Sequence, residues 1–403
     1  MPMNLNESQH EQPIFVIGTG RCGSTMFRGL LDGHRELLVW PFEFPFYVYF
    51  QDSWPKLKKN DTITVGEALA AFEVHLNLFK NNVYAHDLGN ITYSLEIFNS
   101  QAFFEYLNSL TKKMVTRKAF LKLLKNALTI GMGYNINDER KLVVVHNAPS
   151  SNILVDFPES KIIALIRDPI DTYISIKNFY FKAAYNSNRD PCSVYRLYAA
   201  NSRYASILAA AISQITFTYN WISNNYNANK FIVIKLEDLQ NDPLTQMSKC
   251  ATFLGIEFIQ DMLTSTLMGH VHHSNLGSGK KSNGRILSQR SLAKLNYRQE
   301  LTPLEYQWLY NNLLDLPDSH GFSLHEIYPF SKSLGELSIL EFWKPLKHEF
   351  PSIKGDFNKN KNPFKLVAIK CFRLLSFLVS YPVHRFILSR RLSYFLSRYT
   401  QNV

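Results

Sequence analysis

A glycine-rich segment near the amino terminus, residues 18–25 with the sequence GTGRCGST, has the composition of an anion-binding loop. Glycines let a backbone curl until its N–H groups face an anion, and a helix that begins after the turn adds partial positive charge. The spacing matches the phosphate-binding pattern GxxxxGK[ST], but Ser24 replaces its lysine and the cation lies within the loop as Arg21. The loop therefore predicts an anion site and disfavours ATP or GTP chemistry. A strand-to-helix turn that binds nothing is the alternative.

An arginine at the end of a predicted strand is the second candidate. Arg167 follows the apolar run 161–166, and Ser175 lies eight residues later in a helix that Asp168 and Pro169 would begin. Doubly wound sheets bind ligands at the carboxyl ends of their strands, and a planar guanidinium group suits a phosphate. The pair therefore predicts a second anion contact, and an ion pair between Arg167 and a local acid is the alternative.

In this order and spacing the two groups resemble the PAPS-dependent sulfotransferases, in outline from residue 13 to residue 254. In that family a loop like residues 18–25 binds the 5′-phosphosulfate, and an Arg/Ser pair like Arg167 and Ser175 binds the 3′-phosphate. A late segment of the family, with Glu-Asp-Leu, Asp-Pro and Phe-Leu-Gly, is similar to residues 232–255. The resemblance implies a P-loop-like α/β fold and transfer of a sulfuryl group from PAPS to a hydroxyl or an amine, without a metal. The residues that it assigns to PAPS are Gly20, Arg21, Cys22, Gly23, Ser24, Thr25, Arg167 and Ser175.

Sulfuryl transfer is an in-line displacement that needs fixed cations at the leaving phosphate and a base on the acceptor. We expect Arg21 to stabilise the leaving phosphate. The subfamily with an arginine in the loop includes tyrosylprotein sulfotransferases and many bacterial enzymes, and its glutamate base matches Glu43, 22 residues after Arg21. The aromatic residues around Glu43 would desolvate its carboxylate and raise its pKa. A structural carboxylate in an ion pair at a helix start is the alternative.

His146 is the rival for the role of base. The stretch His146-Asn147-Ala148-Pro149 follows a predicted strand, at the point where cytosolic sulfotransferases carry a catalytic histidine two residues before a proline. In this chain Asn147 occupies the position of that histidine. The segment also does not match the relatives that carry Lys-Thr-Pro at this point. His146 is otherwise a hydrogen-bonded structural residue at a strand end.

Two further segments could contact ligands. The stretch 40–54 holds eight aromatic residues, which could stack on sugars or a phenol or form the core under an insertion. A basic loop over residues 277–285 is similar to one that closes over PAPS, and a solvated surface loop is the alternative. Its candidate contacts are Lys280, Lys281 and Gly284. Three histidines precede this loop without Cys or HxxxH partners, so we expect no metal site.

Strand-then-helix units must position these residues. Apolar runs rich in β-branched residues predict strands at 14–17, 142–145, 161–166 and 231–234, and helices at 25–32 and 243–254. Such alternation favours an α/β fold, with a central parallel sheet flanked by helices. We expect a helical insertion at about 55–140 and a basic helical extension at the carboxyl terminus. The predicted parts are a flexible segment 1–12, a sulfotransferase domain 13–343, and a basic linker and amphipathic extension 344–403.

The net charge of +11 is concentrated near the carboxyl terminus. Residues 344–403 contain twelve Lys/Arg and two acids and carry +10, so residues 1–343 carry only +1. A nearly neutral body argues against a nucleic-acid-binding surface. Four cysteines without a CxxC pair fit a reducing compartment, and residues 1–12 lack the apolar core of a signal peptide. We therefore expect a cytoplasmic protein.

The last residues have the pattern of a basic amphipathic helix. Apolar residues follow one helical stripe through Leu388, Leu392, Phe395, Leu396 and Tyr399. Because such helices lie on anionic membranes, residues 363–403 predict a peripheral membrane contact, and a helix packed on the domain is the alternative. The resemblance favours a saccharide or lipid-linked acceptor, and a phenol or a peptide tyrosine are the alternatives. A P-loop nucleotide-dependent kinase, or an inactive membrane-docking protein that retains the loop, are the other functions left open.

Overall fold

The structure is a computed structural model of the chain, and it describes residues 12–44, 46–47, 61–80, 83–86, 91–94, 98–176 and 202–271. The chain divides into two compact units. The first comprises Met1–Arg167 and Asn225–Arg290, and the second comprises Asp168–Asn224 and Ser291–Val403. The predicted extension 344–403 and the lid loop 277–285 lie outside the described residues.

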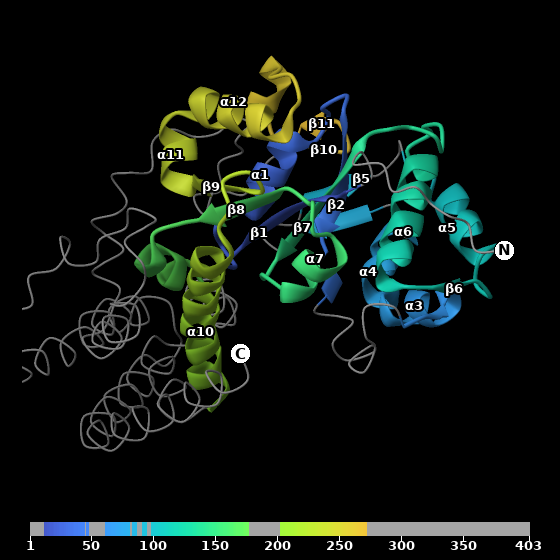
Figure 1. Cartoon of the computed structure of the whole chain (residues 1–403), viewed down its shortest axis with the longest axis horizontal. Coiled ribbons are helices and arrows are strands. Elements are labelled where there is room, and N and C mark those ends of the chain that lie inside the picture. Colours follow the sequence, from blue (N-terminus) through green and yellow to red (C-terminus); the bar gives the residue numbers. More distant parts are fainter. Residues whose placement is uncertain are drawn as a thin grey trace, which may run out of the picture. The chain divides into compact units, whose positions relative to one another are not determined.

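A five-stranded parallel sheet forms the centre of the first unit (Figure 1). Its order is β2-β7-β1-β8-β9, and every neighbouring pair of strands is parallel. All residues of β1 and β8 are buried, as expected of apolar strands that are covered on both faces. The predicted α/β fold, with a central parallel sheet flanked by helices, is confirmed. The strands are β1 Ile14–Gly18, β2 Leu37–Glu43, β7 Lys141–Asn147, β8 Ile162–Ile166 and β9 Phe231–Lys235.

The flanking helix α12 is capped at both ends. Asp242 accepts a hydrogen bond from the Thr245 N–H at 3.1 Å and so starts α12, and Gly255 ends it with a left-handed φ of 66°. α1 and α12 bury their apolar residues in one core with β1, β7 and β8. The flanking elements are α1 Ser24–Leu31, α7 Ser151–Asp156, α11 Leu236–Asn241, α12 Pro243–Leu254, the 3-10 helix η2 Gln260–Leu263, and the two-stranded pair β10 Thr266–Leu267 and β11 His270–Val271.

The segment between β2 and β7 forms the insertion, and it is helical only in part. Within the predicted insertion at about 55–140, four described helices alternate with short antiparallel strands that pair with one another. Strands of two to four residues leave too little alternation to be recognised in a sequence. The elements of the insertion are β3 Ile63–Thr64, α3 Val65–Ala71, α4 Glu73–Lys80, β4 Val83–His86, β5 Ile91–Ser94, α5 Ser100–Asn108, β6 Met114–Val115 and α6 Arg117–Gly131.

The aromatic residues of β2 attach this insertion to the sheet. Trp40 packs edge-to-face on Phe79 of α4 with ring centroids 5.3 Å apart, and Phe44 lies 5.1 Å from Phe72. The described rings of the aromatic stretch, Trp40, Phe42, Phe44, Phe46 and Tyr47, are all at most 2% exposed. These five rings therefore form core, and the alternative of a stacking platform for sugars is wrong for them.

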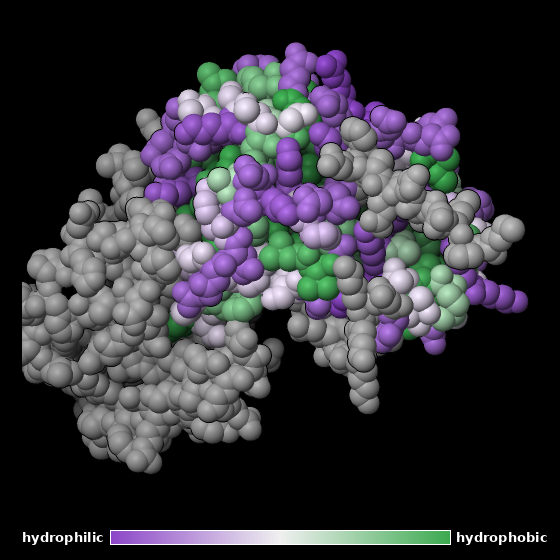
Figure 2. All heavy atoms as spheres, in the orientation of Figure 1, coloured by the Kyte–Doolittle hydropathy of each residue, from purple (hydrophilic) through white to green (hydrophobic). Residues whose placement is uncertain are grey.

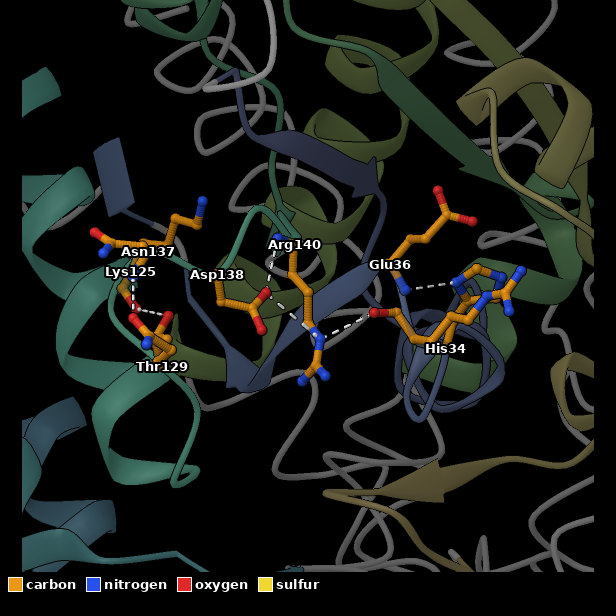
Figure 3. A network of polar contacts seen from close by, with 9 residues as sticks. His34, Glu36, Lys125, Thr129, Asn137, Asp138 and Arg140 are labelled. Carbon is orange, nitrogen blue, oxygen red and sulfur yellow. Dashed lines mark hydrogen bonds and ion pairs between the residues drawn. The ribbon is translucent and has the colours of Figure 1, made fainter.

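Polar contacts close the edge of the sheet at which β2 and β7 begin (Figure 3). The Arg140 Nε donates a hydrogen bond to the Arg35 carbonyl oxygen at 2.9 Å, and its guanidinium lies 3.6 Å over the Tyr134 ring. The Glu36 N–H donates to His34 Nδ1 at 3.1 Å. Because the protein's own groups use this edge, its residues are suited to control variants.

The second unit contributes two described segments. In the helical segment 169–176, Asp168 Oδ1 accepts hydrogen bonds from the Ile170 and Asp171 N–H groups at 2.9 and 3.1 Å, which confirms the predicted cap. The long helix α10 spans Ser202–Asn225. Over the described part of the chain, no helix has both the length and the apolarity to cross a bilayer. Figure 2 shows that hydrophilic residues cover much of the described part of the visible face.

Candidate active site

The carboxyl ends of all five parallel strands meet at one edge of the sheet, which we call the carboxyl edge. β1 ends at Gly18, β2 at Glu43 and β7 at Asn147, and Arg167 follows β8 directly. Open α/β sheets bind ligands at this edge. Since β1 lies between β7 and β8, the loop after β1 is flanked by the ends of both neighbours.

The loop between β1 and α1 is curled by two residues with left-handed backbone. Arg21 has a φ of 69° and Gly23 a φ of 91°. A side chain at Gly23 would also clash, because a Cβ there would lie 2.6 Å from Leu236 Cδ1. No side chain caps α1 at Gly23, so the helix offers its first N–H groups at the loop. The loop is therefore curled as the glycine-rich sequence predicts, and it leads directly into the uncapped start of α1.

Two guanidinium groups lie at this loop. Arg167 Nη1 donates a hydrogen bond to the Arg21 carbonyl oxygen at 3.2 Å. The pKa of Arg21 is lowered mainly by desolvation and secondly by the positive charge of Arg167, whereas the negative charge of Glu43 raises it. Arg21 remains partly open to solvent at the loop surface. Two neighbouring cations repel each other, so an anion bound between them would be stabilised by both.

Glu43 contacts the same loop from the end of β2. The buried Ser24 donates a hydrogen bond through Oγ to Glu43 Oε1 at 3.2 Å. Glu43 is exposed, although the aromatic residues next to it in sequence are buried. The expected desolvation by these neighbours is therefore wrong, since Glu43 is the last residue of β2 and is exposed, whereas the six residues before it are buried. Among the described residues Glu43 has no ion-pair partner within 4 Å, in contrast to the structural alternative.

His146 is buried, and both of its ring nitrogens are engaged. Nε2 accepts a hydrogen bond from the Tyr47 N–H at 3.0 Å, and Nδ1 bonds to the Ala148 carbonyl oxygen. A ring that accepts at Nε2 and faces a carbonyl at Nδ1 carries its proton on Nδ1. Burial lowers the pKa of His146 to about 4. The ring is therefore neutral near pH 7 and has no nitrogen left for a substrate proton.

A buried ion pair supports the segment that follows Glu43. The Tyr47 hydroxyl donates to Asp156 Oδ2 at 3.1 Å, and Arg117 Nη2 contacts Asp156 Oδ1 at 3.1 Å. The Arg117 guanidinium also lies 5.5 Å from the Tyr47 ring centroid. Sequence reasoning missed Arg117 and Asp156, because no motif connects residues on α6 and α7. The contacts fix α6 of the insertion to the chain beyond β2, close in sequence to Glu43.

A comparison with known families decides the assignment. The sequence profile described as "Sulfotransferase family" matches residues 13–261, which is more than half of the chain. The chain belongs to the sulfotransferase family. Its activity is accordingly transfer of a sulfuryl group from a donor to an acceptor. The match contains β1, the loop, Glu43, His146 and Arg167.

Solved structures include similar sulfotransferases. The sulfotransferase domain of the olefin synthase from Synechococcus PCC 7002 is 19% identical, with a TM-score of 0.46 and coverage of 77% of this chain and 98% of that chain. The sulfotransferase domain from the curacin biosynthetic pathway is 20% identical, with a TM-score of 0.41 and coverage of 76% and 99%. A sulfotransferase from Alicyclobacillus acidocaldarius is 15% identical, with a TM-score of 0.37 and coverage of 78% and 98%. No curated protein matches this sequence.

The remaining predicted residues of the sulfotransferase are placed as follows. Cys22 is buried, and burial raises the pKa of its thiol to about 12, so its side chain packs while its backbone belongs to the loop. Its N–H donates to the Thr19 carbonyl oxygen at 3.3 Å. Ser175 is half-buried in the helical segment 169–176 of the second unit. Gly20 and Thr25 belong to the loop and to the first turn of α1, whereas Lys280, Lys281 and Gly284 lie outside the described residues.

Proposed function

We propose that the chain is a PAPS-dependent sulfotransferase that modifies a hydroxyl, less readily an amine, of a saccharide or glycolipid-like acceptor. The observation that carries this proposal is the meeting of three groups at one loop. Arg21 belongs to the loop, Arg167 is hydrogen-bonded to it, and Glu43 is hydrogen-bonded to Ser24 at its end. Cations at a leaving phosphate and a base at an acceptor are the two requirements of sulfuryl transfer.

The donor would occupy the curled loop. Its 5′-phosphosulfate would accept hydrogen bonds from the first N–H groups of α1 and from Arg21, which bears the charge that develops on the leaving phosphate. Arg167 and Ser175 would bind the 3′-phosphate, and Lys280, Lys281 and Gly284 would cover the donor. The replacement of the kinase lysine by Ser24 supports a phosphosulfate over a nucleoside triphosphate.

Glu43 would act as the base. In the transfer, the acceptor oxygen forms a bond to sulfur while the bond from sulfur to the phosphate oxygen breaks. The acceptor proton goes to Glu43, and adenosine 3′,5′-bisphosphate leaves with the bonding electrons. The exposure of Glu43 supports this role because an acceptor can reach it, whereas the two engaged nitrogens of His146 argue against the rival base.

The site of action is part of the same proposal. The +10 charge of residues 344–403 would hold a cytoplasmic enzyme at an anionic membrane surface that carries its acceptor. Pelleting with vesicles of phosphatidylglycerol and phosphatidylcholine tests this part. If a chain that ends at residue 362 bound the vesicles as strongly as the full chain does, this part of the proposal would be contradicted.

Calorimetry with adenosine 3′,5′-bisphosphate tests the donor assignment. We expect one site on the full chain and affinity reduced by about tenfold or more in Arg21→Ala, because a charge-assisted contact contributes about 1.5–3 kcal/mol. Arg35→Ala is the matched control, since Arg35 is exposed and pairs with Glu257 near the opposite edge of the sheet. Absence of binding to the unsubstituted chain would overturn the proposal.

A further inference from the structure

The residue after His146 occupies a strained turn at the carboxyl edge. Asn147 has a φ of 60°, and the Ala148 N–H donates a hydrogen bond to the His146 carbonyl oxygen at 2.7 Å. This bond closes a three-residue γ-turn around Asn147, and the form with a positive central φ is rare and strained. The His146 ring contacts the Ala148 carbonyl oxygen as well, so the turn is held by both backbone and side chain.

The turn lies between the two parts of the proposed site. β7 is the strand between β2 and β1, and Asn147 is its last residue. Ile17 of β1 is in register with Asn147, and Glu43 of β2 is in register with Val145. Neighbouring strands are about 5 Å apart, so the Asn147 backbone lies about one strand spacing from each of its neighbours. Asn147 is thus placed between the proposed base and the proposed donor loop.

The side chain of Asn147 carries a buried polar atom whose hydrogen-bonding capacity is unsatisfied among the described residues. Its Oδ1 is buried and has no hydrogen-bond partner among the described residues, while the residue as a whole is half-buried. A buried carbonyl oxygen without a partner destabilises a fold, and most such groups are satisfied. Neither the strained turn nor the unpaired oxygen benefits the fold, and strain of this kind is typical of functional sites.

The chemistry of the unpaired atom indicates its ligand. An amide oxygen only accepts hydrogen bonds, whereas sulfate and phosphate oxygens of the donor carry no proton to give at neutral pH. A hydroxyl group of the acceptor does carry one. We propose that Asn147 is an acceptor-binding residue whose Oδ1 accepts a hydrogen bond from a second hydroxyl, next to the one that Glu43 deprotonates. This inference rests on the proposed function and narrows the acceptor to a molecule with neighbouring hydroxyls, such as a sugar.

Asn147→Gly removes the side-chain amide but keeps the backbone turn, because glycine adopts a positive φ without strain. We expect its thermal unfolding midpoint to rise by a few degrees, since strain and the unpaired oxygen are both removed. The KM for octyl β-glucopyranoside should increase by about tenfold, the effect of one lost hydrogen bond. Transfer to 4-nitrophenol, which has a single hydroxyl, and binding of adenosine 3′,5′-bisphosphate should not change.

Asn137→Gly is the control, because Asn137 is an exposed turn residue near the opposite edge, and neither measurement should change. A lower unfolding midpoint in Asn147→Gly, or an unchanged KM for the glucoside, would overturn the inference. The inference would also be overturned if the unsubstituted chain modified 4-nitrophenol but not octyl β-glucopyranoside. If the unsubstituted chain neither binds the bisphosphate nor modifies either probe, the proposed function itself fails.

Discussion

Replacement of Glu43 by glutamine removes the proposed base with little change in shape. Glutamine keeps an Oε1 that can accept the Ser24 hydrogen bond, which is 3.2 Å long in the unsubstituted chain. Because Glu43 is exposed and has no ion-pair partner among the described residues, the free energy of unfolding should change by less than about 0.5 kcal/mol. Any loss of activity then reports on chemistry and not on folding.

The size of the effect follows from the role. A positioned general base contributes about 100- to 10,000-fold, so kcat should fall by that factor and the activation free energy should rise by about 3–5 kcal/mol. The affinity for adenosine 3′,5′-bisphosphate should stay unchanged, because Glu43 contacts the donor loop only through the Ser24 hydroxyl.

The assay is transfer of sulfur-35 label from PAPS to octyl β-glucopyranoside, measured with donor in excess. Glu257→Gln is the control, because Glu257 also loses a charge but pairs with Arg35 at an exposed site near the opposite edge, where an ion pair contributes under about 1 kcal/mol. A Glu43→Gln variant that keeps most of the native kcat would refute the base assignment. A loss of bisphosphate affinity as large as the loss of rate would assign Glu43 to donor binding instead.

Three further outcomes follow from the geometry. Gly23→Ala should weaken bisphosphate binding in calorimetry because a Cβ would lie 2.6 Å from a leucine methyl of α11, whereas Gly133→Ala, also at positive φ but with nothing within 4 Å, should keep full affinity. Asp156→Asn should lower the free energy of unfolding in urea by about 3–5 kcal/mol, because it leaves the charge of Arg117 buried and unpaired; a loss below about 1 kcal/mol would contradict this. Burial lowers the pKa of His146 from 6.5 to about 4, so the unfolded chain binds more protons than the folded chain below pH 6.5. The resulting contribution to the free energy of unfolding, up to about 3 kcal/mol, is complete above pH 6.5 and is lost as the pH falls towards 4. Urea unfolding at pH 7 and pH 5 should show this loss in the unsubstituted chain, and an equal loss in His146→Gln would disprove its origin.

Much of the fold is predictable because buried parallel strands have strong local patterns. β1, β7, β8 and β9 are apolar runs rich in β-branched residues, and α12 is bounded by Asp-Pro and Leu-Gly signals. β2 was missed for a physical reason. It contains Pro41 and lacks a row of Val and Ile. Among the described strands it pairs with β7 alone, and an edge strand tolerates a proline that a central strand would not.

The site is predictable only where motif and geometry coincide. Arg21, Arg167 and Glu43 come from spacing and resemblance, and the structure brings them to one loop. The contacts of Asp156 could not be predicted, since its partners Arg117 and Tyr47 are 39 and 109 residues away in sequence. The turn at Asn147 could not be predicted either, because asparagine tolerates a positive φ better than most residues but adopts it only where the surrounding chain requires it.

Titration of the unsubstituted full chain with adenosine 3′,5′-bisphosphate and, in parallel, with ATP tests the central claim most directly. The loop with Arg21 inside it and Ser24 in place of the kinase lysine predicts one bisphosphate per chain and weaker binding of ATP. A chain that binds ATP more tightly than the bisphosphate, or that binds neither, would contradict the assignment of this site to PAPS.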